Sequence, residues 1–387
     1  MAEKQNIPEI RFEGFTDPWE QRKLNEYLET SREKNESCHF GKDDVLSVSG
    51  DYGIVNQIEF QGRSYAGTSV ANYGVVHKGD VVYTKSPLRI NPYGIIKTNR
   101  GNDGIVSTLY AVYHPTEKTH PDFVQVYFEQ NARMNNYMAP LVSKGAKNDM
   151  KVSAENALKG AVTFPGIKEQ EVIASYFSQL DHLITLHQRK YDKLCTVKKS
   201  MLDKMFPKPG ETEPEIRFEG FTDPWEQRKF SEIVDVCSGR DYKHLNEGPI
   251  PVYGTGGYMT SVCEALSHNR DAVGIGRKGT IDKPYLLKAP FWTVDTLFYA
   301  IPKPDINLEF ALCSFLNVDW KSKDESTGLP SLSKEAINET VLRVPNAVEQ
   351  NHLGSFFTDI DSLITLHQRK LELLRNIKKS LLDRMFV

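Results

Sequence analysis

The sequence of 387 residues lacks the features that mark several large classes of protein. It contains no apolar run of 18 or more residues, which excludes an ordinary transmembrane helix. Its start, MAEKQNIPEI, has neither the basic nor the apolar region of a secretory signal peptide. Its cysteines show no C-x-x-C spacing, so neither structural zinc nor a disulfide framework is expected. These absences predict a cytoplasmic protein that does not bind membranes.

Motifs of enzymes are also missing. Asn91-Pro92-Tyr93 lacks the second proline of the N-P-P-Y motif of amino-methyltransferases, and no glycine-rich loop for a methyl donor accompanies it. The segment GIGRKGT, 274–280, does not have the spacing of a phosphate-binding loop. The net charge of −3 is not typical of a nucleic-acid-binding domain, although basic residues cluster locally. We therefore expect no catalytic residues and no metal site.

The most informative feature that is present is an internal repeat. The segment PEIRFEGFTDPWEQRK at 8–23 recurs unchanged at 214–229, and LITLHQRK at 183–190 recurs at 363–370. The first repeat has an offset of 206 residues and the second an offset of 180, so the interior of the second half is 26 residues shorter. The two interiors have almost no sequence in common. A repeated frame with different inserts predicts two similar domains with different targets.

Each half ends in a segment with the heptad spacing of a coiled coil. Mostly apolar residues, with one histidine and one lysine in each half, alternate spacings of four and three from Ile173 to Met205 and again from Leu353 to Met385. Each predicted helix is roughly 50 Å long at about 1.5 Å per residue. Because such a stripe must be buried, we expect the two helices to form an antiparallel coiled coil within the chain. The seam residues proposed for helix pairing and partner docking are Leu180, Ile184, Tyr191, Leu194, Ile360, Ile364, Leu371 and Leu374.

His187 and His367 lie on this seam at equivalent positions. A histidine pair can bind a metal ion or respond to pH, but matched core histidines that satisfy each other by hydrogen bonds are the simpler interpretation.

The two interiors share a faint pattern of predicted strands and helices. The runs 80–85 and 272–277 are rich in β-branched or apolar residues, and each is followed by a second strand-like run, 106–112 and 294–300, that begins V-x-T-L. Helical segments are expected at 123–129 and 308–315, followed by polar loops at 143–153 and 322–333.

The second interior carries basic and aromatic residues that suit contacts with DNA. Its segment 270–288 holds five basic and two acidic residues, and Arg277-Lys278-Gly279-Thr280 directly follows a predicted strand. Arginine can bond guanine bidentately and lysine can contact guanine or phosphate. A solvated charged turn is the alternative interpretation. The candidate DNA-binding residues here are Tyr253, Thr255, Tyr258, Arg277, Lys278, Thr280, Lys321, Lys323 and Thr327.

The first interior has candidates at similar places along the chain, and ordinary loops use the same residue types. They are Lys85, Arg89, Asn99, Arg100, Lys144, Lys147 and Lys151. The helical segments add local positive charge, with seven basic and two acidic residues in 182–208 and six and two in 362–387. These charges are either solvated coiled-coil flanks or contacts to the phosphates of DNA.

Two diverged inserts, each closed by a nearly identical heptad helix that starts P-x-x-x-E-Q (Pro165 to Gln170, Pro345 to Gln350), resemble the specificity subunit of type I restriction-modification systems. The leader RFEGFTDPWEQRK, at 11–23 and 217–229, is also similar to that of this family. The resemblance covers essentially the whole chain.

This resemblance implies a reader of double-stranded DNA rather than a catalyst. Two target recognition domains would each bind one half of a split, asymmetric recognition sequence, and the helices would set the spacing. Two modification subunits, which carry S-adenosylmethionine and methylate adenine, would dock on the repeated frame. Restriction subunits would add ATP- and Mg²⁺-dependent translocation and cleavage, so the chain itself would need no cofactor.

The expected fold class is α+β, a pseudo-two-fold tandem of two mixed α/β recognition domains and two long helices. The expected boundaries are a leader with the first recognition domain at 1–166, the first helix at 167–206, a linker at 207–213, a leader with the second recognition domain at 214–346, and the second helix at 347–387. The main alternative is a scaffold or DNA-mimicking protein built on the coiled coil. A fused methyltransferase or nuclease is a further alternative, which the missing motifs disfavour.

Overall fold

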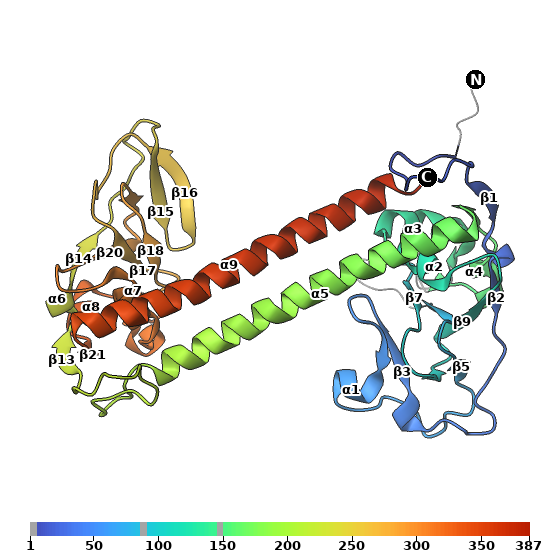
Figure 1. Ribbon diagram of the computed structural model, residues 1–387, viewed down its shortest axis with the longest axis horizontal. Coiled ribbons are helices and arrows are strands. Elements are labelled where there is room, and N and C mark those ends of the chain that lie inside the picture. The colour runs from blue at the N-terminus through green and yellow to red at the C-terminus, as the bar shows by residue number, and fades with distance from the viewer. Residues whose placement is uncertain (1–5, 86–90, 145–149) are drawn as a thin grey trace. The chain divides into compact units, whose positions relative to one another are not determined.

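A computed structural model describes residues 6–85, 91–144 and 150–387 (Figure 1). It divides into two compact units. Unit 1 comprises Met1–Leu186 with Leu371–Val387, and unit 2 comprises His187–Lys370. Both contain helices and mostly antiparallel strands, which confirms the expected α+β class. No helix in the described part of the chain is long and apolar enough to cross a membrane.

The described part of unit 1 is built from short strands, four short α-helices, the beginning of one long helix and the end of the other. Its strands are β1 (Glu20–Lys23), β2 (Leu28–Thr30), β3 (Leu46–Ser49), β4 (Gly53–Asn56), β5 (Gly74–Val76), β6 (Val81–Thr84), β7 (Ile96–Thr98), β8 (Gly104–Val106), β9 (Tyr110–Pro115), β10 (Ser143–Lys144), β11 (Met150–Lys151) and β12 (Ala161–Phe164). Its α-helices are α1 (Gln57–Gln61), α2 (Pro121–Tyr127), α3 (Asn131–Met138), α4 (Ala154–Ala157) and the first part of α5 (Ile167–Lys204).

Unit 2 has a similar plan with a simpler set of accessory strands. Its strands are β13 (Glu226–Lys229), β14 (Val234–Ser238), β15 (Ile250–Gly254), β16 (Gly257–Val262), β17 (Ala272–Gly276), β18 (Tyr285–Leu287), β19 (Trp292–Thr293), β20 (Leu297–Pro302) and β21 (Val341–Val344). Its α-helices are α6 (Phe230–Ile233), α7 (Leu308–Leu316), α8 (Lys334–Asn338) and the greater part of α9 (Ala347–Arg384).

The same four-stranded antiparallel sheet forms the centre of both units. Its strand order is β2-β9-β6-β7 in unit 1 and β14-β20-β17-β18 in unit 2. The helix that follows it is α2 or α7, close to the predicted segments 123–129 and 308–315. The accessory strands differ: unit 1 adds the pairs β3-β4, β5-β8 and β10-β11, whereas unit 2 adds the three-stranded sheet β16-β15-β19.

One detail of the predicted match is wrong. The two V-x-T-L segments, at 106–109 and 294–297, are not structurally equivalent, because the last residue of β6 pairs with Tyr110 whereas the last residue of β17 pairs with Leu297. As a result Leu109 is 61% exposed, while Leu297 is fully buried. The loop that precedes the strand has a different length in each unit, so the sequence match is one residue out of register.

The repeated leader residues hold the start of each long helix in the same way. The Arg11 guanidinium donates two hydrogen bonds of 2.7 Å to the Glu169 carboxylate, and Arg217 donates two of 2.8 Å to Glu349. Both carboxylates are almost completely buried. The strand pairs β1-β12 and β13-β21 also have equivalent registers. Such bidentate, charge-assisted bonds fix orientation as well as adding stability, so the frame is built identically twice.

The two long helices pair antiparallel along the predicted seam (Figure 1). Every predicted seam position is buried or half-buried, from Ile173 to Met205 on α5 and from Leu353 to Met385 on α9. In unit 1 the Lys378 ammonium lies 2.6 Å from the Asp181 carboxylate, and in unit 2 Lys198 lies 2.6 Å from Asp361. These two ion pairs are equivalent in the repeat and run from one helix to the other. The predicted antiparallel coiled coil is therefore confirmed.

His187 and His367 occupy equivalent positions on α5 and α9 and contact each other, with their Nδ1 atoms 2.8 Å apart. One ring therefore donates and the other accepts, which requires at least one neutral ring. Burial lowers the pKa of both rings, and Lys190 and Lys370 lower it further. No cluster of three or more metal-ligating side chains occurs among the residues that the structure describes. The contact agrees with matched histidines that satisfy each other.

Each unit's core is completed by an aromatic residue from the far end of a long helix. In unit 1 Phe386, just after α9, packs against Trp19 and Phe123 at ring-centroid distances of 6.0 and 5.8 Å. In unit 2 Phe206, just after α5, occupies the equivalent place against Trp225 at 5.7 Å. Each unit therefore includes the start of one long helix and the end of the other.

Candidate nucleic-acid interface

Three loops of unit 2 converge where the central strand β17 ends. The backbone N–H of Leu332 donates to the Arg277 carbonyl at 2.9 Å, and that of Gly279 donates to the Pro330 carbonyl at 2.8 Å. Lys278 and Ser331 form an isolated bridge. The loop 277–284 is thus tied to the loop 324–331, although about fifty residues separate them in the sequence.

The β15-β16 hairpin forms the third part of this cluster. The Tyr285 hydroxyl donates to the Gly254 carbonyl at 2.6 Å and joins the hairpin turn to the loop after β17. Thr255 lies beside Gly279, because a Cβ built on that glycine would be 3.9 Å from the threonine Oγ1. Tyr258 is exposed at the hairpin, whereas Tyr253 is half-buried. The structure therefore brings the predicted hairpin residues and the predicted basic loop together.

The turn after β17 depends on glycine. A Cβ on Gly276 would lie only 2.0 Å from the Thr280 carbonyl oxygen, and Gly279 has a φ of +90°, which other residues rarely adopt. The tight turn exposes both Arg277 and Lys278, while Thr280 is half-buried.

Arg277 is an exposed candidate for a base contact. Its Nη1 donates a long hydrogen bond of 3.4 Å to the Asp295 carbonyl, and its guanidinium lies 5.8 Å from the centroid of the Phe298 ring. Arg277 and Lys278 border a cavity of about 390 Å³ that also includes Lys334 and a single acidic residue, Glu325. The arginine is therefore oriented by its neighbours but still exposed, as a side chain that reads a base edge must be.

The remaining candidates of unit 2 lie on the adjoining segment 320–331. Lys321 forms a 2.8 Å ion pair with Asp282, which lowers the pKa of that carboxyl and leaves Lys321 less able to hold a phosphate. Lys323 is half-buried and Thr327 is exposed. Asp324 organises the loop by accepting backbone hydrogen bonds of 2.9 Å from Ser326 and Ser331.

Lys85 is the structural equivalent of Arg277. Val81 of β6 and Val273 of β17 pair with equivalent residues of β9 and β20, and Lys85 and Arg277 each follow four residues later. Lys85 is half-buried, and burial lowers its pKa, as does the nearby Lys34. The two units therefore present a cation at the same end of the same sheet.

The structure contradicts the grouping of Asn99 and Arg100 with Lys85. Thr98 pairs with Val81 at the beginning of β6, so the two residues after Thr98 lie at the opposite end of the strand from Lys85. Asn99 is only 1% exposed. Its Nδ2 donates to two loop carbonyls and its Oδ1 accepts from the Gly101 N–H, which makes it a structural residue of the turn.

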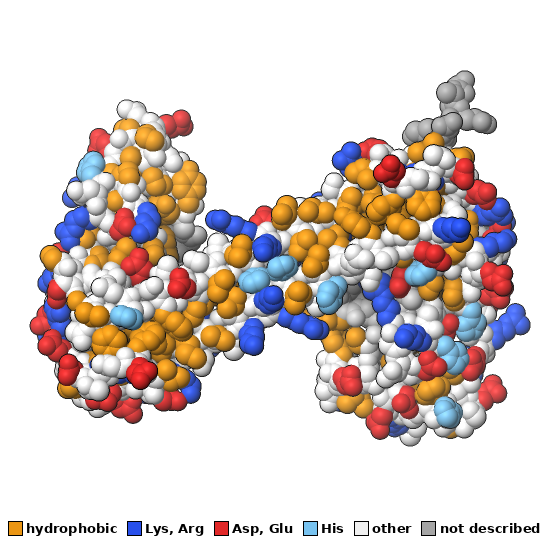
Figure 2. Space-filling view, viewed as in Figure 1, with side chains coloured by type: hydrophobic (Ala, Val, Ile, Leu, Met, Phe, Trp, Pro, Cys, Tyr) orange, Lys and Arg blue, Asp and Glu red, His pale blue; other side chains and the backbone are white. Residues whose placement is uncertain are grey.

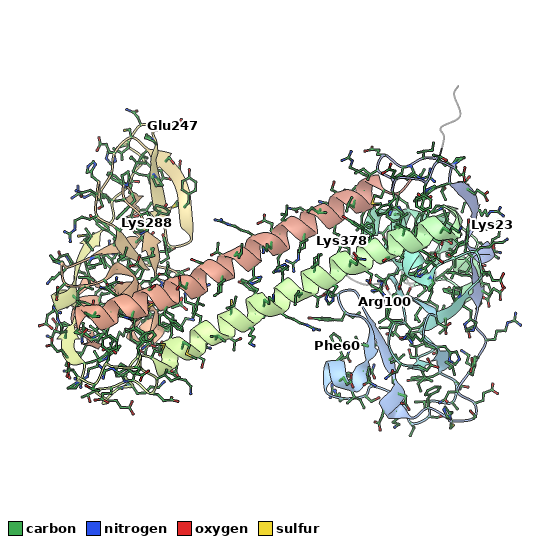
Figure 3. The ribbon with its side chains drawn as sticks, in the orientation of Figure 1. Lys23, Phe60, Arg100, Glu247, Lys288 and Lys378 are labelled. Atoms are coloured by element: carbon green, nitrogen blue, oxygen red, sulfur yellow. The ribbon has the colours of Figure 1, made fainter. Side chains whose placement is uncertain are left out.

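Arg100 is exposed but bonds through Nε to the Asp122 carboxylate at 2.8 Å, at the start of α2 (Figure 3). The sequence grouping failed because it followed order along the chain, whereas antiparallel pairing sends alternate strand ends to opposite edges of a sheet.

Of the remaining predicted residues of the first half, Lys144 and Lys151 belong to the paired strands β10 and β11. Arg89 and Lys147 lie outside the described residues.

Sequence reasoning missed Lys34 and Arg240. Thr30 of β2 and Val236 of β14 are equivalent in the two sheets, and Lys34 and Arg240 each follow four residues later. Both side chains are exposed. The Arg240 backbone is anchored by a 2.8 Å hydrogen bond from its N–H to the Thr293 carbonyl. The available signal was a cation just after the first strand of the sheet in both halves, but recognising it required the strand register.

The seam residues predicted for docking divide into buried and half-buried groups. Leu180, Ile360 and Leu371 are buried, while Ile184, Tyr191, Leu194, Ile364 and Leu374 are half-buried. These residues join the two helices to each other. Exposed leucines beside them, which include Leu183 and Leu186 with their equivalents Leu363 and Leu366, are accessible to a partner.

Comparison with known proteins agrees with this architecture. The family model described as the type I restriction modification DNA specificity domain matches residues 222–376. The type I restriction enzyme MjaVIII specificity subunit of Methanocaldococcus jannaschii is 21% identical over 263 residues, which cover 57% of this chain and 60% of that protein.

The fold is also that of a solved structure, the type I restriction-modification system S subunit from M. genitalium, with a TM-score of 0.69 at 16% identity. That similarity covers 98% of this chain and 99% of the other. The match in sequence over residues 222–376 and the shared fold over nearly the whole length confirm the resemblance to type I restriction-modification specificity subunits.

Proposed function

We propose that this chain is the non-catalytic DNA-reading subunit of a type I restriction-modification complex, in which units 1 and 2 each read one half of an asymmetric, bipartite target. The observation that carries the proposal is the position of Lys85 and Arg277, which follow the same central strand in two units whose surrounding loops differ. A shared scaffold with different loops at one sheet end is suited to reading two different sequences.

Loops of unit 2 supply the side chains for direct contacts in this proposal. Arg277 and Lys278 are exposed at the mouth of the cavity, with Thr255 and Tyr258 on the adjoining hairpin. Arg240 adds a second cation near the end of the sheet. In unit 1 Lys34 and Lys85 take the corresponding roles. Arginine and lysine can contact guanine or phosphate, and the flanking hydroxyls add further hydrogen bonds.

Two modification subunits dock, in this proposal, on the repeated frame. The exposed residues Leu183 and Leu363 belong to the identical segments 183–190 and 363–370, so the chain offers the same surface twice. Two copies of one partner require such a repeated site. The long helices, of 38 residues each, then fix the distance between the half-sites, and restriction subunits join the assembled complex.

The test is to co-express the chain with its modification subunit in a host without other adenine methylation and to map N6-methyladenine across the genome. The expected result is one asymmetric motif made of two short specific parts separated by a gap of fixed length. A single contiguous motif, or a complex that forms but places no methyl groups, would contradict the proposal. The modification subunit expressed alone is the control and should methylate no specific motif.

A further inference from the structure

A second apolar stripe runs along each long helix beside the buried seam, and it faces solvent. On α9 it consists of Leu363, Leu366, Leu373 and Ile377, which are 45, 44, 59 and 37% exposed. With Lys370 included, their spacings alternate threes and fours, as in a heptad repeat. Figure 2 shows apolar side chains interspersed with lysines and arginines along the helix pair.

The chemistry of the stripe points to a helical occupant. Apolar residues at heptad spacing accept the knobs of another helix, and scattered surface residues do not keep this rhythm. Lys190 and Lys370 are exposed within the stripe, and both helical segments carry an excess of basic residues. The occupant that fits is an amphipathic helix whose apolar face is bordered by acidic side chains. This step rests on the proposed function, in which two copies of the modification subunit each supply one such helix.

The two docking surfaces are not equal, although the frame around them is repeated. In unit 1 the surface contains Leu183, Leu373 and Ile377, and the Asp181–Lys378 ion pair holds the two helical segments side by side. In unit 2, 180 residues away in the repeat, Leu363 matches Leu183, but Lys193 stands in place of Leu373. The unit 2 surface therefore has a charged residue at the position where the unit 1 surface has its most exposed leucine.

A second difference also makes the unit 2 surface less apolar than the unit 1 surface. The equivalent of Ile377 is Val197, which is smaller and half-buried, so it offers less apolar area to a partner. A helix that docks on unit 2 must also cover the position of Lys193. The Lys193 ammonium can remain in water at little cost in free energy only if the side chain bends away from the partner.

We propose that the two surfaces bind the same partner with different affinity, so that the first copy docks on unit 1, at Leu183, Leu373 and Ile377, and the second on unit 2. Docking on unit 1 buries one more leucine and one fewer ammonium than docking on unit 2. The dissociation constant of the unit 1 site should therefore be lower by at least about tenfold. A complex with one partner copy is therefore an intermediate of defined geometry.

The experiment titrates the full-length chain with purified modification subunit and follows the 1:1 and 2:1 complexes by native mass spectrometry. The wild type should show two dissociation constants that differ by about tenfold or more after the statistical factor is removed. In the 1:1 complex, hydrogen exchange should be slowed in 371–384 but not in 189–197. Exchange in 189–197 should slow only when the 2:1 complex forms.

Two reciprocal variants test the cause of the difference. Leu373→Lys should weaken the first binding step until the two constants converge, and Lys193→Leu should strengthen the second step with the same result. Lys199→Leu is the matched control, since it adds a leucine to the same helix on an exposed position outside the stripe, and both constants should be unchanged. Since all three positions are exposed, thermal unfolding should be nearly that of the wild type.

The possible failures are distinct. Two equal constants in the wild type, unaffected by either variant, would overturn the inequality while leaving the proposed function intact. Binding that begins on unit 2, seen as protection of 189–197 first, would also overturn it. No complex with the modification subunit at micromolar concentrations would instead contradict the proposed function itself.

Discussion

Lys85 in unit 1 and Arg277 in unit 2 follow the same central strand of the same four-stranded sheet, yet the chain around them differs. In unit 2 the β15-β16 hairpin is tied to the loop that carries this cation, whereas the accessory strands of unit 1 form the separate pairs β3-β4 and β5-β8. The residues that hold the sheets to the helices are by contrast identical, as the Arg11–Glu169 and Arg217–Glu349 pairs show. The residues that are identical between the two units thus lie in the frame, and the residues that differ lie in the loops that the frame supports.

This contrast teaches where each type of constraint acts. A frame residue such as Glu349 is buried and bonded, so most replacements leave an unpaired charge inside the protein. A loop residue such as Lys278 is exposed and makes few contacts, so it can change without loss of stability. Recognition can therefore diverge between the units while the supporting structure remains the same.

The largest effect is expected from removing the aromatic residue that completes each core. Phe386→Ala should destabilise unit 1 by about 3–5 kcal/mol, because a buried ring is lost and a cavity remains. Hydrogen exchange measured by mass spectrometry should show faster exchange in β1 and α2 and no change in β13 and α7.

Phe206→Ala is the reciprocal variant and should open unit 2 with the opposite pattern. If either variant loosens both units equally, the two cores are not independent, and the comparison between the units loses its basis.

A smaller effect that separates the units is expected from the equivalent lysines of the helix pair. Lys378 contacts both Asp181 and Glu129 and is 14% exposed (Figure 3), whereas Lys198 contacts Asp361, which is 43% exposed. Burial opposes the charge of Lys378, but Glu129 and Asp181 outweigh it and raise the pKa of the ammonium.

Lys378→Met should therefore cost about 2–3 kcal/mol, since it strands two partly buried carboxylates, and Lys198→Met about 1 kcal/mol or less. Chemical unfolding of the two variants measures the difference. Equal losses would mean that the second contact of Lys378, with Glu129, adds nothing to the stability of unit 1.

The comparison of the recognition surfaces is sharpened by Arg277→Ala. Loss of one bidentate contact should reduce discrimination at one base position by about 1–3 kcal/mol, and only in the half-site read by unit 2. The methylated motif of the variant complex reports this directly. Lys288→Ala is the control, because Lys288 lies at the other end of β17 and is paired with Asp271. An unchanged motif in folded Arg277→Ala would remove this residue from the interface.

The smallest effect concerns the contact between His187 and His367. The folded pKa of both rings is lowered by burial, so the unfolded chain binds more protons as the pH falls. The pair's contribution is complete above about pH 6.5, the unfolded value, and is lost as the pH falls through the lower folded pKa.

The melting temperature of the wild type should thus fall more between pH 7 and pH 5 than that of the double variant His187→Gln, His367→Gln. The variant His182→Gln, on the exposed surface of α5, is the control and should follow the wild type. Identical pH slopes for all three proteins would show that the histidine contact is not linked to protonation.

Much of the frame was predictable because its signals are local or exactly repeated. The spacing of Ile173, Phe177 and Leu180 requires a helix with one buried face, and its repetition at Leu353, Phe357 and Ile360 supplies the partner. The equivalent strands β6 and β17 were also recognisable from their β-branched and apolar composition. Their place in a common sheet order was not.

The candidate site was only partly predictable, because it depends on strand register. The sequence predicted Arg277 and the residues of the β15-β16 hairpin separately, each as part of a loop of suitable chemistry, and did not indicate that the two loops lie side by side. Asn99 was grouped with Lys85 although they lie at opposite ends of β6 and β7, and Arg240 was overlooked although it lies near the end of the sheet that bears Arg277. A shift of one residue, as in the V-x-T-L segments, is invisible without the pairing.

The sequence by itself therefore determined the duplicated frame, the two long helices and their antiparallel pairing, since heptad spacing and exact repeats act through short-range geometry. Only the tertiary structure decided which loops share one end of a sheet, which cations are buried or paired, and that Leu373 faces solvent where Lys193 stands in the other half. These facts depend on hydrogen-bond register and packing between segments far apart in the chain, and no local pattern encodes either.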